Sequence, residues 1–138
     1  MRDIKFRVWD KETKHIHIFG DDIHDAITSE GKTNKIYYYN LQNGCDSLDE
    51  DSDYVLMQYT GLKDKNGKEI FEGDIVYFNY REPQRHEIIF EDGSFWLKDK
   101  DSQCTPIHEV KEICFGASNF YLEVIGNVWE DSDLLNDN

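Results

Sequence analysis

The sequence predicts a mainly β protein with few short helices, and three observations support this. Apolar and polar residues alternate over several short segments, which is the period-2 pattern of half-buried strands. Gly-containing turn signals such as Asn66-Gly67 and Asp92-Gly93 separate these segments. Aromatic residues make up 14% of the 138 residues and supply large side chains for a core. Short strands joined by tight turns favour a small barrel or a sandwich.

The first 19 residues predict a β-hairpin. Ile4, Phe6 and Val8 alternate with Lys5 and Arg7, so we expect Arg7 on the polar face of a strand. The segment "DKET" then predicts a turn, and "HIHIF" alternates again.

Residues 20–53 combine several weaker signals. Within "DDIHDAITSEG", Ile23 and Ile27 lie four apart behind an Asp and before Gly31, which predicts a short helix. The segment "KIYYYN" predicts a strand, and residues 43–53 predict an acidic loop. This loop divides the chain into residues 1–53 and 54–138, which form either two domains or one integrated domain.

The C-terminal half contains the clearest turns. After a strand at residues 54–60, Asn66 and Gly67 occupy the two central positions of a tight turn, where they tolerate the positive φ of type I′. A second turn is predicted at Glu72-Gly73-Asp74. A second hairpin is predicted from "HEIIF" to "SFWLK", across Glu91-Asp92-Gly93.

The last third of the chain predicts a helix and a final strand. Thr105 is the expected cap, with Pro106 at the first helical position. The segment "FYLEVIGNVWE" then predicts a long strand, with Gly126 marking a bulge.

The formal net charge of -14 is the strongest global signal. Lys and Arg number 7 against 12 Asp and Glu in residues 1–53, and 8 against 17 in residues 54–138. The acidic excess is therefore spread along the chain. Such a surface repels the phosphate backbone of nucleic acid, so a basic protein partner, or simple solubility, explains the charge better than nucleic-acid binding does.

Cysteine usage and hydropathy predict a cytoplasmic protein. Cys45, Cys104 and Cys114 form an odd set without a paired framework. No apolar run reaches the roughly 18 residues of a membrane span, and no signal-peptide core follows the first residues. We expect no membrane association.

No cofactor, metal or catalytic site is predicted. His15 and His17 lie on one face of the expected strand, with Asp21 nearby, and are the best metal-ligand candidates. We interpret both histidines as the solvent face of that strand. The segment "AITSEGKT" matches a loose phosphate-loop pattern but lacks the preceding buried strand and the following helix.

Four residues are candidates for macromolecule binding: Tyr77, Arg81, Arg85 and Trp96. Aromatic side chains on a small barrel can stack single-stranded bases, yet such sites normally include a basic groove. Packing in the core or at an interface is the preferred interpretation. Tyr37-Tyr38-Tyr39 places rings on both faces of one strand, which suits a subunit interface as well as a core.

Two segments carry a family resemblance. "QYTGLKDKNGKEIFEGDIV", followed by "EVIGNVWED", resembles the YopX family of phage and prophage proteins, and the opening "KFRVWDKETK" is also similar. The resemblance implies an origin in phages or prophages of Gram-positive bacteria. It also implies that the C-terminal half is an SH3-like barrel beginning at "GDIV". It implies no catalytic mechanism.

Together these features predict a non-enzymatic phage or prophage accessory protein. We expect it to self-associate and to engage a basic host or phage protein through its acidic surface. The alternatives are a nucleic-acid-binding small β-barrel and, less favoured, a metal-dependent enzyme.

Overall fold

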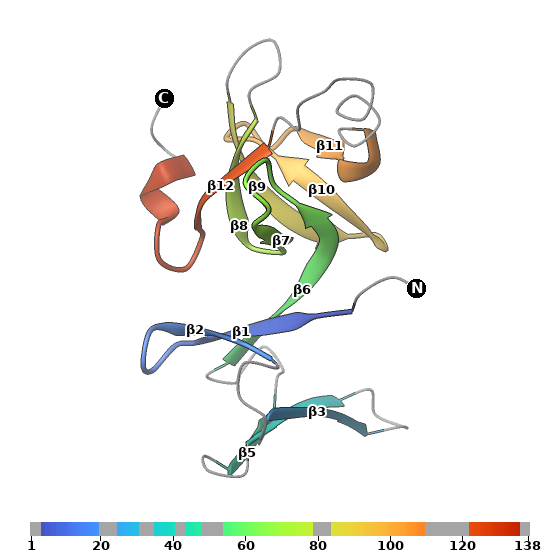
Figure 1. The fold of residues 1–138 in the computed structure, drawn as a ribbon, viewed down its shortest axis with the longest axis vertical. Coiled ribbons are helices and arrows are strands. Elements are labelled where there is room, and N and C mark those ends of the chain that lie inside the picture. Colours follow the sequence, from blue (N-terminus) through green and yellow to red (C-terminus); the bar gives the residue numbers. More distant parts are fainter. Residues whose placement is uncertain are drawn as a thin grey trace. The chain divides into compact units, whose positions relative to one another are not determined.

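The structure, a computed structural model, describes residues 4–19, 25–30, 35–40, 44–47, 54–78, 84–109 and 122–135. Strands β1 to β12 form three sheets in these residues, and a short 3-10 helix, η1 (Ser132–Leu135), follows the last strand (Figure 1). The prediction of a mainly β fold is confirmed. The SH3-like character of the C-terminal half stays a prediction.

The chain divides into two compact units within strand β6 (Tyr54–Lys63). Ile4–Gln58 forms one unit, and Tyr59–Asn138 belongs to the other. The first part of β6 pairs antiparallel with β1 (Phe6–Asp10), and its later part pairs with β7 (Glu69–Phe71). One strand therefore contributes to both units. The assignment of residues 1–53 and 54–138 to domains stays a prediction.

The predicted N-terminal hairpin is confirmed, because β1 pairs antiparallel with β2 (His15–Ile18). The expectation that Arg7 lies on a solvent face is wrong. Arg7, Val8 and Trp9 are 6%, 1% and 7% exposed. Successive side chains of a strand point to opposite faces, so both faces of β1 are covered.

The helix expected within residues 21–31 is wrong where the structure describes it. Asp25–Glu30 forms strand β3, which pairs antiparallel with β4 (Lys35–Asn40) along its whole length. Backbone pairing with a strand rich in tyrosine outweighs the weak four-residue spacing of Ile23 and Ile27. Residues 21–24 and Gly31 lie outside the described residues.

Part of the acidic loop expected at residues 43–53 is also a strand. Gly44–Ser47 forms β5, which pairs antiparallel with β4 in the order β3-β4-β5. The expected strand "KIYYYN" is therefore the central strand of this sheet. Residues 48–53 lie outside the described part.

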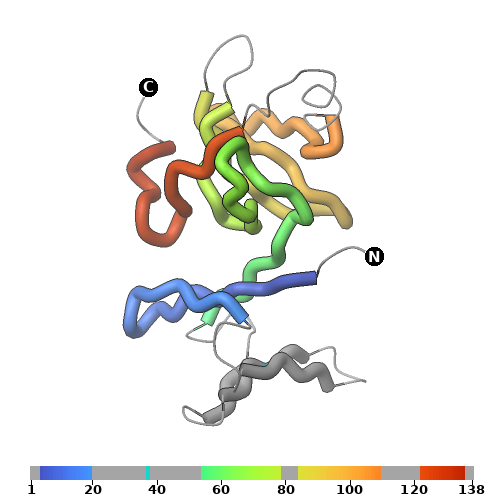
Figure 2. Tube along the Cα trace, viewed as in Figure 1, coloured from blue at the N-terminus to red at the C-terminus, as the bar shows by residue number. Residues whose placement is uncertain are grey.

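A five-stranded antiparallel sheet organises the other unit. Its order is β11-β10-β9-β8-β12, and the colours in Figure 2 follow the chain as the C-terminal β12 returns to lie beside β8. The sheet curls around one buried cluster of apolar side chains. The strands are β8 (Asp74–Phe78), β9 (Gln84–Glu91), β10 (Ser94–Lys98), β11 (Cys104–Pro106) and β12 (Leu122–Asn127), and the cluster is Ile70, Val76, Ile88, Leu97 and Leu122.

The β9–β10 hairpin is confirmed, and its turn has the type I′ geometry. Asp92 and Gly93 both have positive φ, at 51° and 77°. The turn at residues 65–68 is not of type I′, which corrects our prediction. Gly67 has a φ of 83°, but Asn66 is not in the positive-φ region.

The start of the predicted helix after residue 104 is corrected. Thr105 and Pro106 belong to β11, where they pair with Leu97 and Trp96 of β10. Residues 107–109 are helical. Proline fits here because β11 is an edge strand, in which one side of the backbone needs no ladder hydrogen bond.

The bulge expected at Gly126 is confirmed by a register shift between Val124 and Gly126 in the pairing of β12 with β8. The chain then turns back on itself. Asn127 Oδ1 accepts hydrogen bonds from the amides of Trp129 and Glu130, at 3.0 and 2.9 Å. The backbone amide of Asn127 donates a hydrogen bond to Asp131 Oδ2 at 3.2 Å. These contacts close the "GNVWED" segment as a compact turn.

We predict that Gly126→Ala destabilises the protein by about 1–3 kcal/mol, because the new methyl group overpacks the turn. A Cβ at Gly126 would lie 2.7 Å from Asp131 Oδ2 and 2.9 Å from Asp131 Cβ. Urea unfolding measures the loss. In the Asp131→Gly background the cost of Gly126→Ala should shrink, and equal costs in both backgrounds would contradict this explanation.

Candidate functional site

The charge-rich segment from Asp64 to Asp74 is the first candidate site, and its contacts show what these charges do. Asp64 Oδ1 accepts hydrogen bonds from the amides of Asn66 and Lys68, both at 2.9 Å. The Asp64 carbonyl accepts a hydrogen bond from the Gly67 amide at 3.0 Å, and the Asp64 amide donates one to the Lys68 carbonyl at 2.7 Å. These bonds describe a type I turn followed by a glycine with positive φ.

The same turn occurs a second time, between β10 and β11. Asp99 Oδ1 accepts from the amides of Asp101 and Gln103, both at 2.9 Å. The backbone bonds repeat the pattern, with Ser102, at a φ of 63°, in the place of the glycine. Both turns begin with Asp-Lys, and both are closed by the Asp side chain.

Asp10 closes a related turn between β1 and β2. Its Oδ1 accepts from the amides of Glu12 and Thr13, and Lys14 donates to the Asp10 carbonyl and has a φ of 56°. Asp10 is also followed by Lys. The chain therefore uses the dipeptide Asp-Lys three times to open a hairpin turn.

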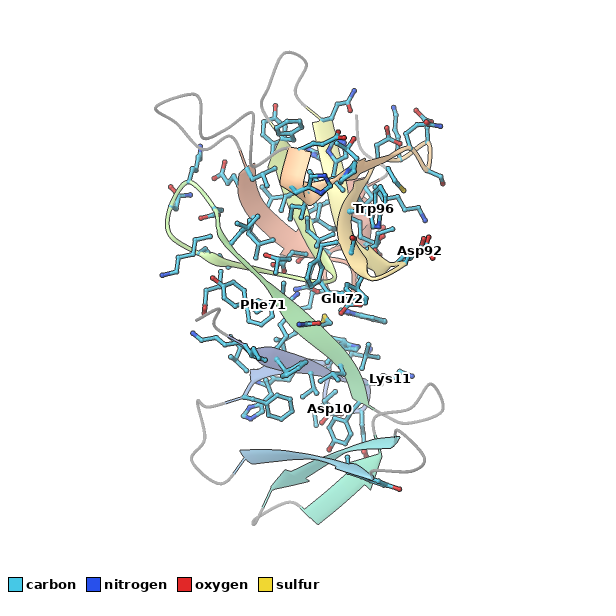
Figure 3. All side chains as sticks on the ribbon, turned by 90° about the vertical axis from the view of Figure 1, so that its right-hand side faces the viewer. Asp10, Lys11, Phe71, Glu72, Asp92 and Trp96 are labelled. Carbon is cyan, nitrogen blue, oxygen red and sulfur yellow. The ribbon has the colours of Figure 1, made fainter. Side chains whose placement is uncertain are left out.

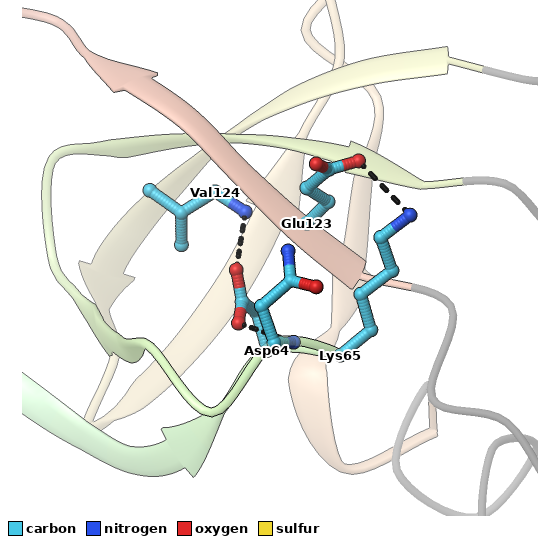
Figure 4. Close-up of polar contacts among 5 residues, drawn as sticks. Asp64, Lys65, Glu123 and Val124 are labelled. Atoms are coloured by element: carbon cyan, nitrogen blue, oxygen red, sulfur yellow. Dashed lines mark hydrogen bonds and ion pairs between the residues drawn. The ribbon is translucent and has the colours of Figure 1, made fainter.

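Asp64 differs from the other two because it also reaches a distant strand. Its Oδ2 accepts a hydrogen bond from the Val124 amide at 3.0 Å, across 60 residues of sequence (Figure 4). The Lys65 amide donates to the Leu122 carbonyl at 2.9 Å, and Lys65 Nζ lies 3.2 Å from Glu123 Oε2. Asp64 is only 6% exposed. The turn is thus bonded to the outer edge of β12.

Asp74 is the second buried carboxylate of this segment. It is 2% exposed, and its Oδ2 accepts a hydrogen bond from the Phe71 amide at 2.8 Å. Two backbone hydrogen bonds hold the turn that Asp74 closes. The Gly73 amide donates to the Ile88 carbonyl, and the Gly73 carbonyl accepts from the Val128 amide. Asp64 and Asp74 both serve the architecture of the sheet.

The three described macromolecule-binding candidates, Tyr77, Arg85 and Trp96, lie on one sheet face but do not form one platform. The register pairs Tyr77 with Arg85, and Trp96 with Ile89. The side chains of both pairs belong to the sheet face opposite the apolar cluster. Arg85 and Ile89 are four residues apart, roughly 13 Å along the strand. Arg81 lies outside the described residues.

The side-chain nitrogens of Arg85 and Trp96 donate hydrogen bonds to the protein itself. Arg85 Nη1 donates to the Leu134 carbonyl at 3.1 Å, which ties η1 to strand β9. Trp96 Nε1 donates to the Glu91 carbonyl at 3.0 Å, and Figure 3 shows Trp96 near Asp92 at the same end of the β9–β10 hairpin. Both residues therefore have structural roles, which favours the packing interpretation of this face.

The metal-ligand candidates do not converge in the part of the chain that the structure describes. His15 is exposed, and His17 is half-buried with its ring 6.2 Å from the ring of Phe19. No group of three or more His, Cys, Asp or Glu side chains suited to a metal occurs among the described residues. Asp21 lies outside them.

Two titratable residues that the sequence did not single out have perturbed pKa values. His86 is 5% exposed, its Nδ1 has no hydrogen-bond partner, and its ring lies 6.0 Å from that of Phe78. Desolvation lowers its pKa, while the charge of Asp99 and the backbone of Gln84 oppose this shift. The only sequence signal was that His86 alternates with Ile88 in "HEIIF", on the core side.

Glu87 lies on the opposite face of β9, beside Lys98 of β10. Desolvation raises the pKa of its carboxyl group, and the charge of Lys98 opposes the shift. His86 and Glu87 point to opposite faces, so they do not form an acid–base pair.

The fold and these contacts define a small, mainly β protein whose charge-dense turns build the architecture of the sheet. It belongs to the YopX family, because the sequence profile of the YopX protein matches residues 5–136. The predicted resemblance is thereby confirmed. Among the residues that the structure describes, no helix has the length and apolar character needed to cross a bilayer.

Two solved structures are similar to the chain over nearly its whole length. The crystal structure of protein EF1440 from Enterococcus faecalis has 28% sequence identity and a TM-score of 0.60, covering 98% of this chain and 99% of that chain. The crystal structure of YopX from Bacillus subtilis has 23% identity and a TM-score of 0.64, with the same coverage, and supports the fold. No curated protein matches the chain.

We predict that Asp64→Ala lowers the free energy of unfolding by about 2–4 kcal/mol, because it leaves three amides without their charged acceptor. Asp99→Ala removes the same two turn bonds but no bond to a distant strand, and should cost about 1 kcal/mol. Urea unfolding at about pH 8, where neutral histidine dominates, measures both. Equal losses would show that the Val124 bond contributes nothing.

We also predict that His86 makes the protein less stable in mild acid. Its pKa is lower in the folded state than the ordinary 6.5, so the unfolded state binds more protons below that pH. The free energy of unfolding should therefore fall as the pH drops from about 6.5 through the folded pKa. His86→Leu should lack this part of the slope in urea titrations between about pH 7.5 and 5.5.

Glu87 provides the control of opposite sign. Its raised pKa means that the folded state binds more protons, so its contribution to stability is present at low pH and is lost as the pH rises through the folded pKa. Glu87→Gln should therefore change the slope in the other direction. If His86→Leu and the parent protein show the same pH slope, His86 is not the group responsible.

Proposed function

We propose that this chain is a non-enzymatic accessory protein that engages a basic protein through its acidic surface. The observation that carries the proposal is the net charge of -14 on a folded chain. Among the acidic side chains that the structure describes, Asp64 and Asp74 are the buried ones. The others remain at least partly accessible and contribute to the external field.

The location of these acids supports a broad electrostatic surface. Several are exposed and lie on different loops and hairpins of both units, so within the described part of the chain no single cluster defines the charge. A field of this kind attracts a basic partner at long range and weakens as salt shortens the Debye length to about 8 Å. Among the residues whose burial the structure describes, the exposed acids are Glu12, Glu91, Asp92, Asp101, Glu109, Glu130 and Asp133.

A protein partner fits this surface better than nucleic acid does. Like charges repel, and binding to a phosphate backbone depends on neutralising cations. Arg85, one of the basic candidates, already donates to Leu134 of its own chain. In its strongest form, the proposal is that the acidic surface imitates the charge of DNA and occupies the groove of a nucleic-acid-binding protein.

The remaining parts of the proposal rest on sequence. From the resemblance to phage and prophage proteins we propose that the protein acts in a bacterial cytoplasm, where both host and phage supply basic proteins. Self-association is proposed from the consecutive residues Tyr37, Tyr38 and Tyr39 of strand β4, because tyrosine is enriched at subunit interfaces.

We predict that the tagged protein retains a basic protein from bacterial lysate after nuclease treatment and releases it as salt rises from about 50 to 200 mM. Mass spectrometry identifies the retained protein, which is then purified and titrated directly. The variant Glu91→Gln, Asp101→Asn, Glu109→Gln should release it at lower salt. The variant Lys11→Gln, Lys68→Gln, Lys100→Gln, with three cations removed, should hold it to higher salt.

The two triple variants control for each other, because a folding defect would weaken binding in both. Binding that is insensitive to salt would contradict the proposal. Retained material that disappears with nuclease would instead favour the nucleic-acid alternative, which Trp96→Ala and a single-stranded oligonucleotide then test.

A further inference from the structure

The outer edge of strand β12 is the feature that carries an inference beyond the proposed function. β12 is the last strand of its sheet, in the order β11-β10-β9-β8-β12. An edge strand presents backbone N–H and C=O groups that can template another strand, so folded proteins usually protect such edges. In β12, individual hydrogen bonds from neighbouring turns protect the edge.

Along β12, the backbone groups of alternate residues point toward β8 and away from it. Those of Leu122 and Val124 point away from β8. The Leu122 carbonyl accepts a hydrogen bond from the Lys65 amide at 2.9 Å. The Val124 amide donates to Asp64 Oδ2 at 3.0 Å (Figure 4). One backbone donor and one side-chain acceptor therefore replace two of the hydrogen bonds that a neighbouring strand would supply.

The other end of the strand is closed in a similar way. The Asn127 amide donates to Asp131 Oδ2 at 3.2 Å, and Gly126 lets the Asp131 side chain approach. Asp64, from the turn between β6 and β7, and Asp131, from the turn that follows β12, thus each accept a hydrogen bond from an amide of one short strand. Asp99, in the otherwise matching turn, makes only its local turn bonds in the contacts described for it.

We propose that the turn at residues 64–68 is a built-in cap that keeps the edge of β12 closed to strand addition by a second copy of the chain. A carboxylate suits this role because it accepts hydrogen bonds but donates none. It therefore satisfies the Val124 amide without presenting a donor or a free backbone to another chain. The proposal is independent of the basic partner proposed above.

Two substitutions remove the cap in different ways. Asp64→Ala removes the acceptor for the Val124 amide. Lys65→Pro removes the amide that binds the Leu122 carbonyl, and proline is favoured at this second position of a type I turn. Asp99→Ala is the matched control for the first variant. Lys65→Ala, which keeps the amide but loses the ion pair with Glu123, is the control for the second.

The test is the molar mass of all five proteins by size-exclusion chromatography with light scattering, from about 10 µM to 1 mM. The two cap variants should form larger species than the parent as concentration rises, and the two controls should follow the parent. Hydrogen exchange by NMR then locates the contact. The Val124 amide should exchange faster in dilute Asp64→Ala and regain protection in the larger species.

Three results would overturn the proposal. The first is a folded Lys65→Pro variant, judged by circular dichroism, with the same mass as the parent at every concentration. This variant decides the matter if Asp64→Ala does not fold. The second is a larger species in which the Val124 amide stays unprotected, which would place the contact elsewhere. The third is equal association of the Asp99→Ala control.

Discussion

The satisfaction of backbone amides by aspartate side chains is the constraint on which the rest of this structure depends. A chain of short strands has many turns and several sheet edges, and each leaves N–H groups outside the regular ladders. Asp64, Asp99 and Asp10 each bind two amides of a hairpin turn. A carboxylate has two oxygens with several acceptor positions, so one side chain can serve more than one amide.

Asp64 shows why the side chain must be aspartate. One of its oxygens holds the turn and the other holds β12, so the same residue fixes a local conformation and a contact across 60 residues. Burying this carboxylate would be costly without partners, and three charge-assisted hydrogen bonds offset that cost. Asparagine would have one acceptor oxygen for both tasks, and its amide group would face the Val124 donor. A serine hydroxyl is too short to span them.

Sequence patterns predicted the hairpins well and the buried polar contacts poorly. Alternation in "HEIIF" and "SFWLK", with Asp92-Gly93 between them, depends on neighbouring residues alone and was confirmed. The turn type at Asn66-Gly67 was wrong, because the Asp64 side chain binds the amides of Asn66 and Lys68 and so favours a type I turn. That preference depends on a residue outside the dipeptide.

The other wrong predictions have a common cause, which is contact between residues that lie far apart in the sequence. The four-residue spacing of Ile23 and Ile27 favoured a helix, but pairing with β4 made Asp25–Glu30 a strand. Arg7 looked solvent-facing until both faces of β1 were found to be covered. Contacts with Val124 and with η1, which define the roles of Asp64 and Arg85, join residues about 50 to 60 positions apart. No local pattern contains that information.

The structural use of these aspartates separates two kinds of acidic residue, and this bears on where function can reside. Asp64 in "KDKNGKE" and Asp131 in "GNVWED" accept hydrogen bonds from backbone amides, so these two acids specify the fold. Among the described residues, the accessible acids are scattered over several turns and strands. A function based on them is a property of the summed field. It should therefore respond gradually to the number of charges changed and to salt, whereas a site built on a few residues would be lost with any one of them.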